Sequence, residues 1–517
     1  MDYRFTFERH SRRVEAVLAG TVIADSTRTV VLRETRLPPV FYFPREDVRM
    51  DLLVPSAHRT YCPLRGNASY WTAELPGRRE ENIAWSYEAP LAEAEPIRGH
   101  IAFHAERLDA LRDGGAPVPP HDPAADAGYA NPLLGWLLHE APGYGSARDL
   151  TGALAARMAA AGIALWRMTV LLRTLHPEVV GTSYRWWRKT WAVEEFRAPH
   201  SVLESPEYLN SPVRAIFEGA GGIRRRLEGP APLLDFGILG ELHAEGATDY
   251  VAMPMPFSDG TINVLSLASD RPGGFSTADL GHVYEIAGVL GRLYEAHAMR
   301  RTAADLLDTY LGRHAGERVL NGTIRRGDGE DIRAVIWFCD LRESTRLARA
   351  SDRREFLATL NEYFDCMAGA VLANGGHVLR FIGDAALAIF PIAGDGAAPT
   401  GAACARALAA AREAARAVAA LNDARRAAGR PEIGFGIGLH VGEVTYGNIG
   451  TPSRLEFTVI GEAANYAARL EALCKDLAEP IVVSAEFARA AAGRFRPLGR
   501  HALKGMDEPQ ALFAPAP

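Results

Sequence analysis

The feature that most limits how this chain can fold is the run GGAPVPPHDPAADAGYANP at residues 114–132. So dense a mixture of proline, glycine and aspartate interrupts both helical and strand periodicity, and no single element can continue through it. At 517 residues the chain also exceeds what one hydrophobic core usually fills. We therefore predict a multidomain protein with a linker over residues 114–148.

Composition narrows the kind of partner. Hydrophobic residues make up 48% and charged residues 23%, which is typical of a globular protein. The net charge of −6 gives no electrostatic footprint for nucleic acid. The alanine-rich run at 407–421 is interrupted by charges, so we expect no membrane span. An odd, scattered set of five cysteines and an amino terminus without an apolar stretch predict a cytoplasmic protein with a small-molecule partner.

Local patterning divides the rest of the chain into four parts. Short β-like runs predict a mainly β domain at 1–113, and a helical period followed by strand-like runs predicts an α+β domain at 149–304. Residues 305–330 are expected to form a helical connector. Strand and helix then alternate from 331 to 517, which predicts an α/β sandwich.

Two aspartates in this last part are candidate metal ligands. Asp340 follows an apolar strand and precedes a helix expected at 344–373, and Asp384 lies at the turn between strands expected at 377–382 and 385–390. Carboxylates at neighbouring strand ends can hold two Mg²⁺ ions beside a triphosphate. The alternative is local: Asp340 is a helix cap and Asp384 a turn residue, positions that aspartate favours in any protein.

Polar residues further on offer contacts for a nucleotide. Asn465 and Arg469 are four apart and share one face of a predicted helix, where an amide and a guanidinium suit a ribose and a phosphate. Lys504, in a late strand-like stretch, adds a cation suited to terminal phosphates. Taken singly, these are equally well read as surface residues.

The separated motifs resemble those of a known family. In order, WFCDLRESTRL, LRFIGDAALAIF, GFGIGLHVGEVTYGNIG, EFTVIGEAANYAARLE and HALKGMDEPQALF are similar to the successive motifs of a class III adenylate or guanylate cyclase catalytic domain. The resemblance covers about 331–513 and implies a ferredoxin-like core. Several motifs in the right order are far more specific than any one alone.

The resemblance assigns roles to individual residues. It implies that two Mg²⁺ or Mn²⁺ ions per site are bound by Asp340, Asp384 and the Leu341 carbonyl. The family's transition-state pair corresponds to Asn465 and Arg469. The residues it places on phosphate are Glu343, Ser344 and Thr345 at the start of the following helix, together with Lys504. Active sites of this family lie between two catalytic domains, each of which contributes a complementary set of residues. Because this chain carries both sets of residues, the resemblance implies a homodimer.

Base selection departs from the family pattern. Adenylate cyclases of this class usually have a lysine at the position of Arg380, paired with an aspartate or threonine at the position of Thr458. Arg380 can donate to adenine N1 or to guanine O6, but its planar fork does not replace a lysine equivalently. We predict an adenylate cyclase that converts ATP to cyclic AMP. The alternatives are a guanylate cyclase and a nucleotide-binding module without turnover.

The upstream parts carry weaker resemblances. Residues 249–254, reading DYVAMP, resemble part of a GAF-type sensor, which predicts a GAF-like domain at 149–304. Its aromatic cluster, Tyr184, Trp186, Trp187 and Trp191, either lines a small-molecule pocket or belongs to the core. Residues 1–113 are similar to a small β-rich family of unknown function, which names no chemistry.

Overall fold

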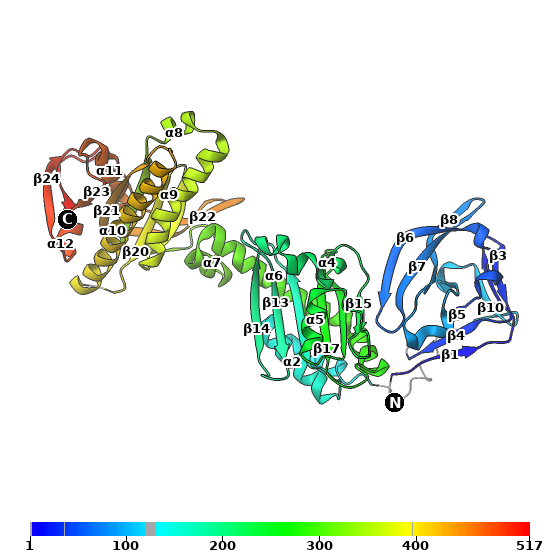
Figure 1. Cartoon of the computed structure of the whole chain (residues 1–517). Helices are drawn as coiled ribbons and strands as arrows, with labels where there is room; N and C mark the ends of the chain where they lie inside the picture. Colours follow the sequence, from blue (N-terminus) through cyan, green and yellow to red (C-terminus); the bar gives the residue numbers. More distant parts are fainter. Residues whose placement is uncertain (1–2, 36, 119–129, 395, 517) are drawn as a thin grey trace. The chain divides into compact units, whose positions relative to one another are not determined.

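The computed structural model describes residues 3–35, 37–118, 130–394 and 396–516. The chain folds as two compact units, Met1–Thr302 and Ala303–Pro517 (Figure 1). It comprises β-rich sheets in the amino-terminal part, a central mixed α/β region and a carboxy-terminal α/β domain.

The amino-terminal part of the first unit consists of three small sheets. Their strand orders are β1-β4-β5, β11-β10-β2-β3 and β6-β7-β8-β9. The strands are β1 (Phe5–Arg9), β2 (Val14–Leu18), β3 (Thr21–Ser26), β4 (Val30–Glu34), β5 (Val40–Tyr42), β6 (Leu53–Cys62), β7 (Gly66–Leu75), β8 (Arg78–Ser86), β9 (Ala102–Phe103), β10 (Ala110–Asp113) and β11 (Ala116–Pro117). The mainly β prediction for this part is confirmed.

The central part is built on one antiparallel sheet of order β14-β13-β12-β17-β16-β15. Its strands are β12 (Arg167–Arg173), β13 (Val179–Trp187), β14 (Val193–Pro199), β15 (Ile223–Arg226), β16 (Asp249–Pro256) and β17 (Ile262–Ser269). Its helices are α1 (Leu134–His139), α2 (Ala147–Ala160), α3 (Pro206–Leu209), α4 (Pro212–Phe217), α5 (Gly237–Ala244) and α6 (Thr277–Leu311). Apolar residues of α2, α6 and the sheet share one core.

Part of the expected linker is folded. Residues 119–129 of that prediction lie outside the described residues, but α1 falls within 114–148 and buries Trp136 and Leu137. The proline-rich run therefore ends earlier than the predicted linker, because the apolar residues from Leu133 onward can be buried against the central core.

The connector is one long helix and one short one. α6 is continuous to Leu311, and Gly312, with φ of 82°, ends it. α7 (Arg313–Leu320) follows at once. Glycine tolerates this left-handed backbone, so the break is encoded locally.

The second unit contains a sheet of order β19-β20-β18-β21-β23-β25-β24, with β22 paired to β21. Its strands are β18 (Gly329–Arg342), β19 (His377–Ile382), β20 (Ala385–Pro391), β21 (Gly434–Thr451), β22 (Arg454–Ile460), β23 (Ile481–Ser484), β24 (Phe495–His501) and β25 (Gln510–Pro515). Its further helices are α8 (Ser344–Ala350), α9 (Arg353–Ala373), α10 (Ala397–Ala427), α11 (Glu462–Asp476) and α12 (Ala485–Ala490). The succession β18-α9-β19-β20-α10-β21 is the βαββαβ order of a ferredoxin-like core.

Helices cover both faces of this sheet. α9 and α10 lie side by side (Figure 1) and pack with Trp337, Cys339 and Phe390 in one core. On the other face, Ala315 of α7 and Ala467 of α11 pack into a second core with further sheet residues. The sheet is thus buried on both faces and holds its strand ends rigidly.

Two expected elements differ from the structure. The helix predicted at 344–373 is broken, because Asp352 caps α9 by accepting a 2.9 Å hydrogen bond from the Glu355 amide. The sequence also predicts two separate strands, at 433–441 and 444–448. They form one strand, β21, since Gly442 pairs in register with Ala334 of β18. Gly442 does not form a turn here; its missing side chain leaves room for Ala463, whose Cβ would lie 2.5 Å from a Cβ on Gly442.

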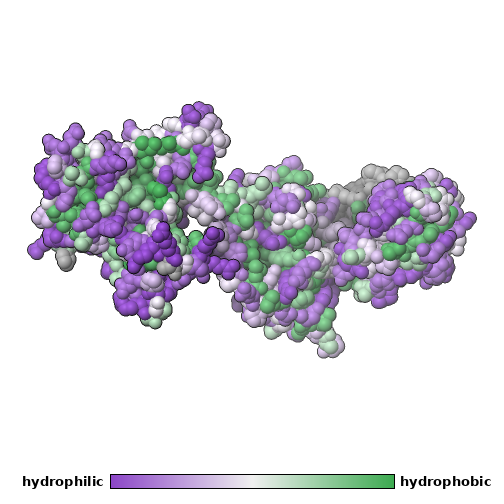
Figure 2. Space-filling model, turned by 90° about the horizontal axis from the view of Figure 1, so that it is seen from above, coloured by the Kyte–Doolittle hydropathy of each residue, from purple (hydrophilic) through white to green (hydrophobic). Residues whose placement is uncertain are grey.

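Among the described residues, no helix is both long and apolar enough to cross a membrane. Hydrophilic residues are spread over each part of the face seen in Figure 2, with smaller hydrophobic areas between them.

Candidate active site

The strand register brings Asp340 and Asp384 together. Asp340 pairs with Ala385, the residue that follows Asp384 in the turn between β19 and β20. The Leu341 amide also donates to the Asp384 carbonyl oxygen at 3.3 Å. Two carboxylates that are far apart in sequence therefore lie at the same end of adjacent strands.

One oxygen of the Asp340 carboxylate lacks a hydrogen-bond partner among the described residues. Its Oδ1 is buried and accepts no hydrogen bond from the described residues. Burial, and then the neighbouring Asp384 carboxylate, raise the pKa of Asp340 above its ordinary value. An unpaired buried carboxylate oxygen beside a second carboxylate is costly unless a cation joins them.

This donor set suits Mg²⁺ or Mn²⁺. No group of three or more His, Cys, Asp and Glu side chains gathers as a cage within the described ranges. Mg²⁺, however, is usually held by one or two carboxylates and completes its shell with water and substrate phosphate. Asp340, Asp384 and the backbone at Leu341 fit that requirement.

The segment after Asp340 turns sharply. Glu343 adopts a left-handed backbone with φ of 56° at the start of α8, and its carboxylate pairs with Arg346 at 2.5 Å. Ser344 and Thr345 are the first residues of α8. Because Glu343 is occupied by an arginine, its side chain is a poor phosphate contact, and the amides of Ser344 and Thr345 are the better candidates.

Asn465 and Arg469 lie on α11, as the sequence predicts. The helix is held closely to β21, because a Cβ on Gly438 would overlap the Ala467 carbonyl oxygen. Asn465 is exposed and Arg469 half-buried. The pair therefore projects from α11 into solvent and is free to contact a ligand.

Lys504 lies in a turn after β24, and the strand-like stretch predicted for it is wrong. A Cβ on the next residue, Gly505, would lie 3.4 Å from Arg469 Nη2. The turn that carries exposed Lys504 therefore lies against Arg469, so this part of the domain offers two cations of the kind that bind phosphates.

Arg380 and Thr458, the two residues predicted to select the base, lie on different strands, β19 and β22. The register of β19 against β20 shifts between Val378 and Arg380, and such a bulge redirects the side chains that follow it. Arg380 reaches β22, where its Nη1 donates to Glu456 Oε2 at 2.7 Å. Thr458, two residues further along β22, is buried, and its hydroxyl has no partner among the described residues.

The sequence did not single out Arg342 and Glu471. Arg342 Nη2 lies 2.8 Å from Glu471 Oε1 and also donates to the Glu471 carbonyl oxygen. Burial raises the pKa of Glu471 to about 7, with smaller contributions in the same direction from Asp340 and Asp384. The only signal available was spacing, since each lies two residues after a predicted site residue.

Within one chain, Asn465 and Arg469 do not lie on the side of α11 that faces Asp340 and Asp384. Glu471 points toward the Asp340 side, but it is two residues beyond Arg469, about 200° around the helix. Arg469 therefore leaves α11 on the side opposite Glu471, and Asn465, about 120° from Glu471, does not share the side of Glu471 either.

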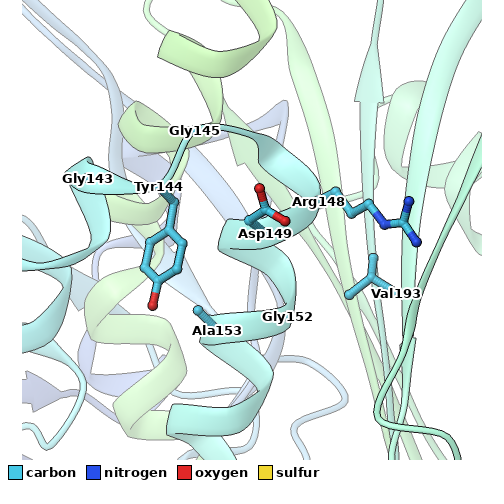
Figure 3. A pocket seen from close by; sticks show the side chains of 8 residues that line it. All are labelled: Gly143, Tyr144, Gly145, Arg148, Asp149, Gly152, Ala153 and Val193. Carbon is cyan, nitrogen blue, oxygen red and sulfur yellow. The ribbon is translucent and has the colours of Figure 1, made fainter.

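An open hollow of about 660 Å³ lies in the central part (Figure 3). It is lined by Gly143, Tyr144, Gly145, Arg148, Asp149, Gly152, Ala153 and Val193. None of the predicted aromatic cluster lines it. Tyr184 and Trp186 are buried in the core, Trp187 packs on Trp166, and Trp191 is 59% exposed.

The second unit thus combines a ferredoxin-like sheet, two neighbouring carboxylates at its strand ends and basic residues on other elements of the same domain. Residues 330–513 match the family described as adenylate and guanylate cyclase catalytic domain. Residues 6–114 match a family described as a domain of unknown function, DUF427. The second unit therefore carries a class III nucleotidyl cyclase catalytic domain, and the first begins with a DUF427 domain.

Several known proteins are similar to parts of this chain. An uncharacterized protein of Mycobacterium tuberculosis is 34% identical over 44% of this chain and 41% of its own length. Adenylate cyclase 1 of Rhizobium meliloti is 33% identical over 32% of this chain and 25% of its own. The adenylyl cyclase CyaB of P. aeruginosa, a crystal structure, is 26% identical with a TM-score of 0.32, over 37% of this chain and 96% of that one. The chain spans less than half the length of these two curated relatives.

Proposed function

We propose that the protein is an adenylate cyclase that converts ATP to 3′,5′-cyclic AMP and pyrophosphate. The observation that carries the proposal is the placement of Asp340 beside Asp384, with a buried carboxylate oxygen that the protein leaves without a partner. The catalytic-domain match at 330–513 and the adenylate cyclase from Rhizobium meliloti among the similar proteins support it.

Asp340, Asp384 and the Leu341 carbonyl would hold two Mg²⁺ or Mn²⁺ ions. When bound, the ions neutralise the triphosphate and favour ionisation of the 3′ hydroxyl. No protein nucleophile is needed, because the ribose oxygen attacks the α-phosphorus directly and pyrophosphate leaves.

The remaining residues orient the substrate and balance its charge. The Asn465 amide holds the ribose so that its 3′ oxygen is aligned with the α-phosphorus. The Arg469 guanidinium stabilises charge that develops on the α-phosphate, and Lys504 contacts the terminal phosphates. The amides of Ser344 and Thr345 add donors at the phosphate end.

Adenine is read by Arg380 and Thr458. An Arg380 N–H donates to N1, and the Thr458 hydroxyl accepts from the exocyclic amine. The partnerless hydroxyl of Thr458 supports this role, since a buried polar group without a partner costs about 1–3 kcal/mol that a ligand can recover.

The active form is a homodimer with two equivalent sites. The geometry of α11 supports this, because Arg469 leaves the helix on the side opposite Glu471, the residue that pairs with Arg342 beside the carboxylates of the same chain. A second copy related by twofold symmetry can supply the missing set to each site.

The first unit regulates this activity. We propose that the central part is a GAF-like sensor for a small molecule and that α6 and α7 transmit its state to the catalytic domain. α7 supports this, because Arg318 lies over the rings of Tyr446 and Phe457, next to Thr458.

The direct test is to incubate the purified full chain with Mg²⁺ or Mn²⁺ and either ATP or GTP. Cyclic AMP from ATP is the expected product. Cyclic GMP alone would make the protein a guanylate cyclase, a candidate that the free N–H groups of Arg380 favour through guanine O6. Absence of product from either nucleotide would leave a binding module without turnover.

A further inference from the structure

We infer that Glu456 is a specificity-determining residue that orients Arg380 toward adenine. The inference rests on the proposed function and adds to it Glu456, the first residue of the EFTVIGEAANYAARLE motif, to which the sequence analysis gave no role. It begins from the ion pair between Arg380 Nη1 and Glu456 Oε2, which are 2.7 Å apart.

The position of Glu456 ties it to base recognition. Side chains two apart on a strand leave it on the same face, so Glu456 and Thr458 point the same way from β22. Arg380 arrives on that face from β19 after the bulge. Arg380 and Glu456 are therefore in contact on the face of β22 that also carries Thr458, although β19 and β22 are not hydrogen-bonded neighbours.

The ion pair leaves most of the Arg380 fork available. A guanidinium has five N–H donors, and Glu456 takes one from Nη1. No other hydrogen bond of Arg380 is made within the described part of the chain. Glu456 thus orients the Arg380 guanidinium through Nη1 and leaves its other N–H groups available to the base.

This arrangement explains how an arginine can serve where a lysine is usual. A lysine presents a compact charge that needs no particular plane, whereas an arginine is directional and must be aimed. Adenine offers an acceptor at N1 beside a donor at its amine, which matches a fixed Arg380 N–H beside the Thr458 hydroxyl. If the fork can rotate freely, it can donate two N–H groups to guanine O6 equally well.

Both side chains are partly exposed, 39% for Arg380 and 47% for Glu456, so the pair adds little to stability. Its effect is expected in substrate selection, where holding one long side chain in place avoids an entropic cost on binding. The effect should appear mainly in KM for ATP, with kcat less affected.

The test compares Glu456→Gln with wild type in the full chain, with kcat and KM measured for ATP and for GTP. Loss of the carboxylate charge is expected to lower the ratio of kcat/KM for ATP to that for GTP about tenfold, mainly through a higher KM for ATP. The matched control is Glu432→Gln, because Glu432 forms a similar exposed pair with Arg426 and is 54% exposed. Control kinetics should equal those of wild type.

A double-mutant cycle shows whether Glu456 acts through Arg380. Glu456→Gln should have no further effect on nucleotide preference in an Arg380→Ala background. A preference in Glu456→Gln within twofold of wild type, or full additivity with Arg380→Ala, would overturn the inference.

Measuring the binding of nucleotide analogues tests the role of Glu456 independently of the proposed cyclase activity. If wild-type protein forms no cyclic product, the cyclase proposal fails, and titration with non-hydrolysable ATP and GTP analogues then decides about Glu456. Glu456→Gln must still lose preference for the ATP analogue. An unchanged preference rejects the role of Glu456 whatever the turnover.

Discussion

At the scale of single residues, a substitution of Asp384 should affect activity without affecting stability. Asp384 lies in a two-residue turn and is only half-buried. Asp384→Ala should lower cyclase activity at least about a hundredfold, because one of two cation ligands is lost, while the thermal midpoint stays close to wild type. Activity and melting are measured on the same preparation.

The control for that variant is Asp423→Ala, which removes an exposed aspartate paired with Arg426 on α10. It should be fully active. Turnover by Asp384→Ala equal to that of this control would reject the metal assignment.

His440 is a residue whose charge should matter to stability. It is buried against Tyr466, with ring centroids 4.2 Å apart, and its Nδ1 lies 2.9 Å from Ser484 Oγ. Burial lowers the pKa of His440 to about 4. Between pH 6.5 and 4 the unfolded chain binds a proton that the folded chain does not, so acid destabilises the fold.

His440→Gln removes this titration. Wild type should lose up to about 3 kcal/mol more stability than the variant between pH 7 and pH 4. Calorimetric midpoints of the two proteins across this range provide the measurement. Parallel pH profiles would show that His440 titrates normally in the fold.

At the scale of elements, the packing of α11 against β21 at Gly438 sets the position of Asn465 and Arg469. A Cβ on Gly438 would lie 2.6 Å from the Glu471 amide as well as overlapping the Ala467 carbonyl oxygen. Gly438→Ala should therefore push α11 outward, costing about 1–3 kcal/mol and displacing Asn465 and Arg469. Lower stability together with lower kcat is the expected result.

Gly369→Ala is the matched control, since a Cβ there meets nothing within 4 Å and the residue lies inside α9. It should be neutral or stabilising by about 0.5–1 kcal/mol. A Gly438→Ala protein as stable and active as Gly369→Ala would show that α11 can shift at no cost.

At the scale of the whole molecule, the proposed dimer makes a prediction that no monomer can meet. Asp384→Ala and Arg469→Ala should each be inactive alone. Co-expressed, they should recover about a quarter of wild-type activity, because half of the dimers are mixed and one of their two sites is intact. Cyclic AMP formation by the purified mixture is the readout, and sedimentation reports the mass.

An inactive mixture that sediments as a dimer would mean that each site is built from one chain. Activity of either variant alone would instead remove that residue from the catalytic set.

Sequence alone predicted the parts of this protein that depend on local patterns. The β-rich start, the hairpin that carries Asp384 and the helix that carries Asn465 and Arg469 follow from periodicity and turn residues. The catalytic domain itself could be recognised because its motifs keep their order along the chain, whereas the roles of its single residues stay predictions. Failures occurred where local signals compete, as at Asp352, whose capping broke a helix that the apolar period had favoured.

Tertiary structure decided which residues meet. The strand register places Asp340 beside Asp384, Arg380 contacts Glu456 after a bulge in β19, and α11 packs closely against β21 at Gly438. The pairing of Arg342 with Glu471 also belongs here. None of these contacts has a signature in sequence, because each joins segments that are distant along the chain and are brought together only by packing the whole sheet.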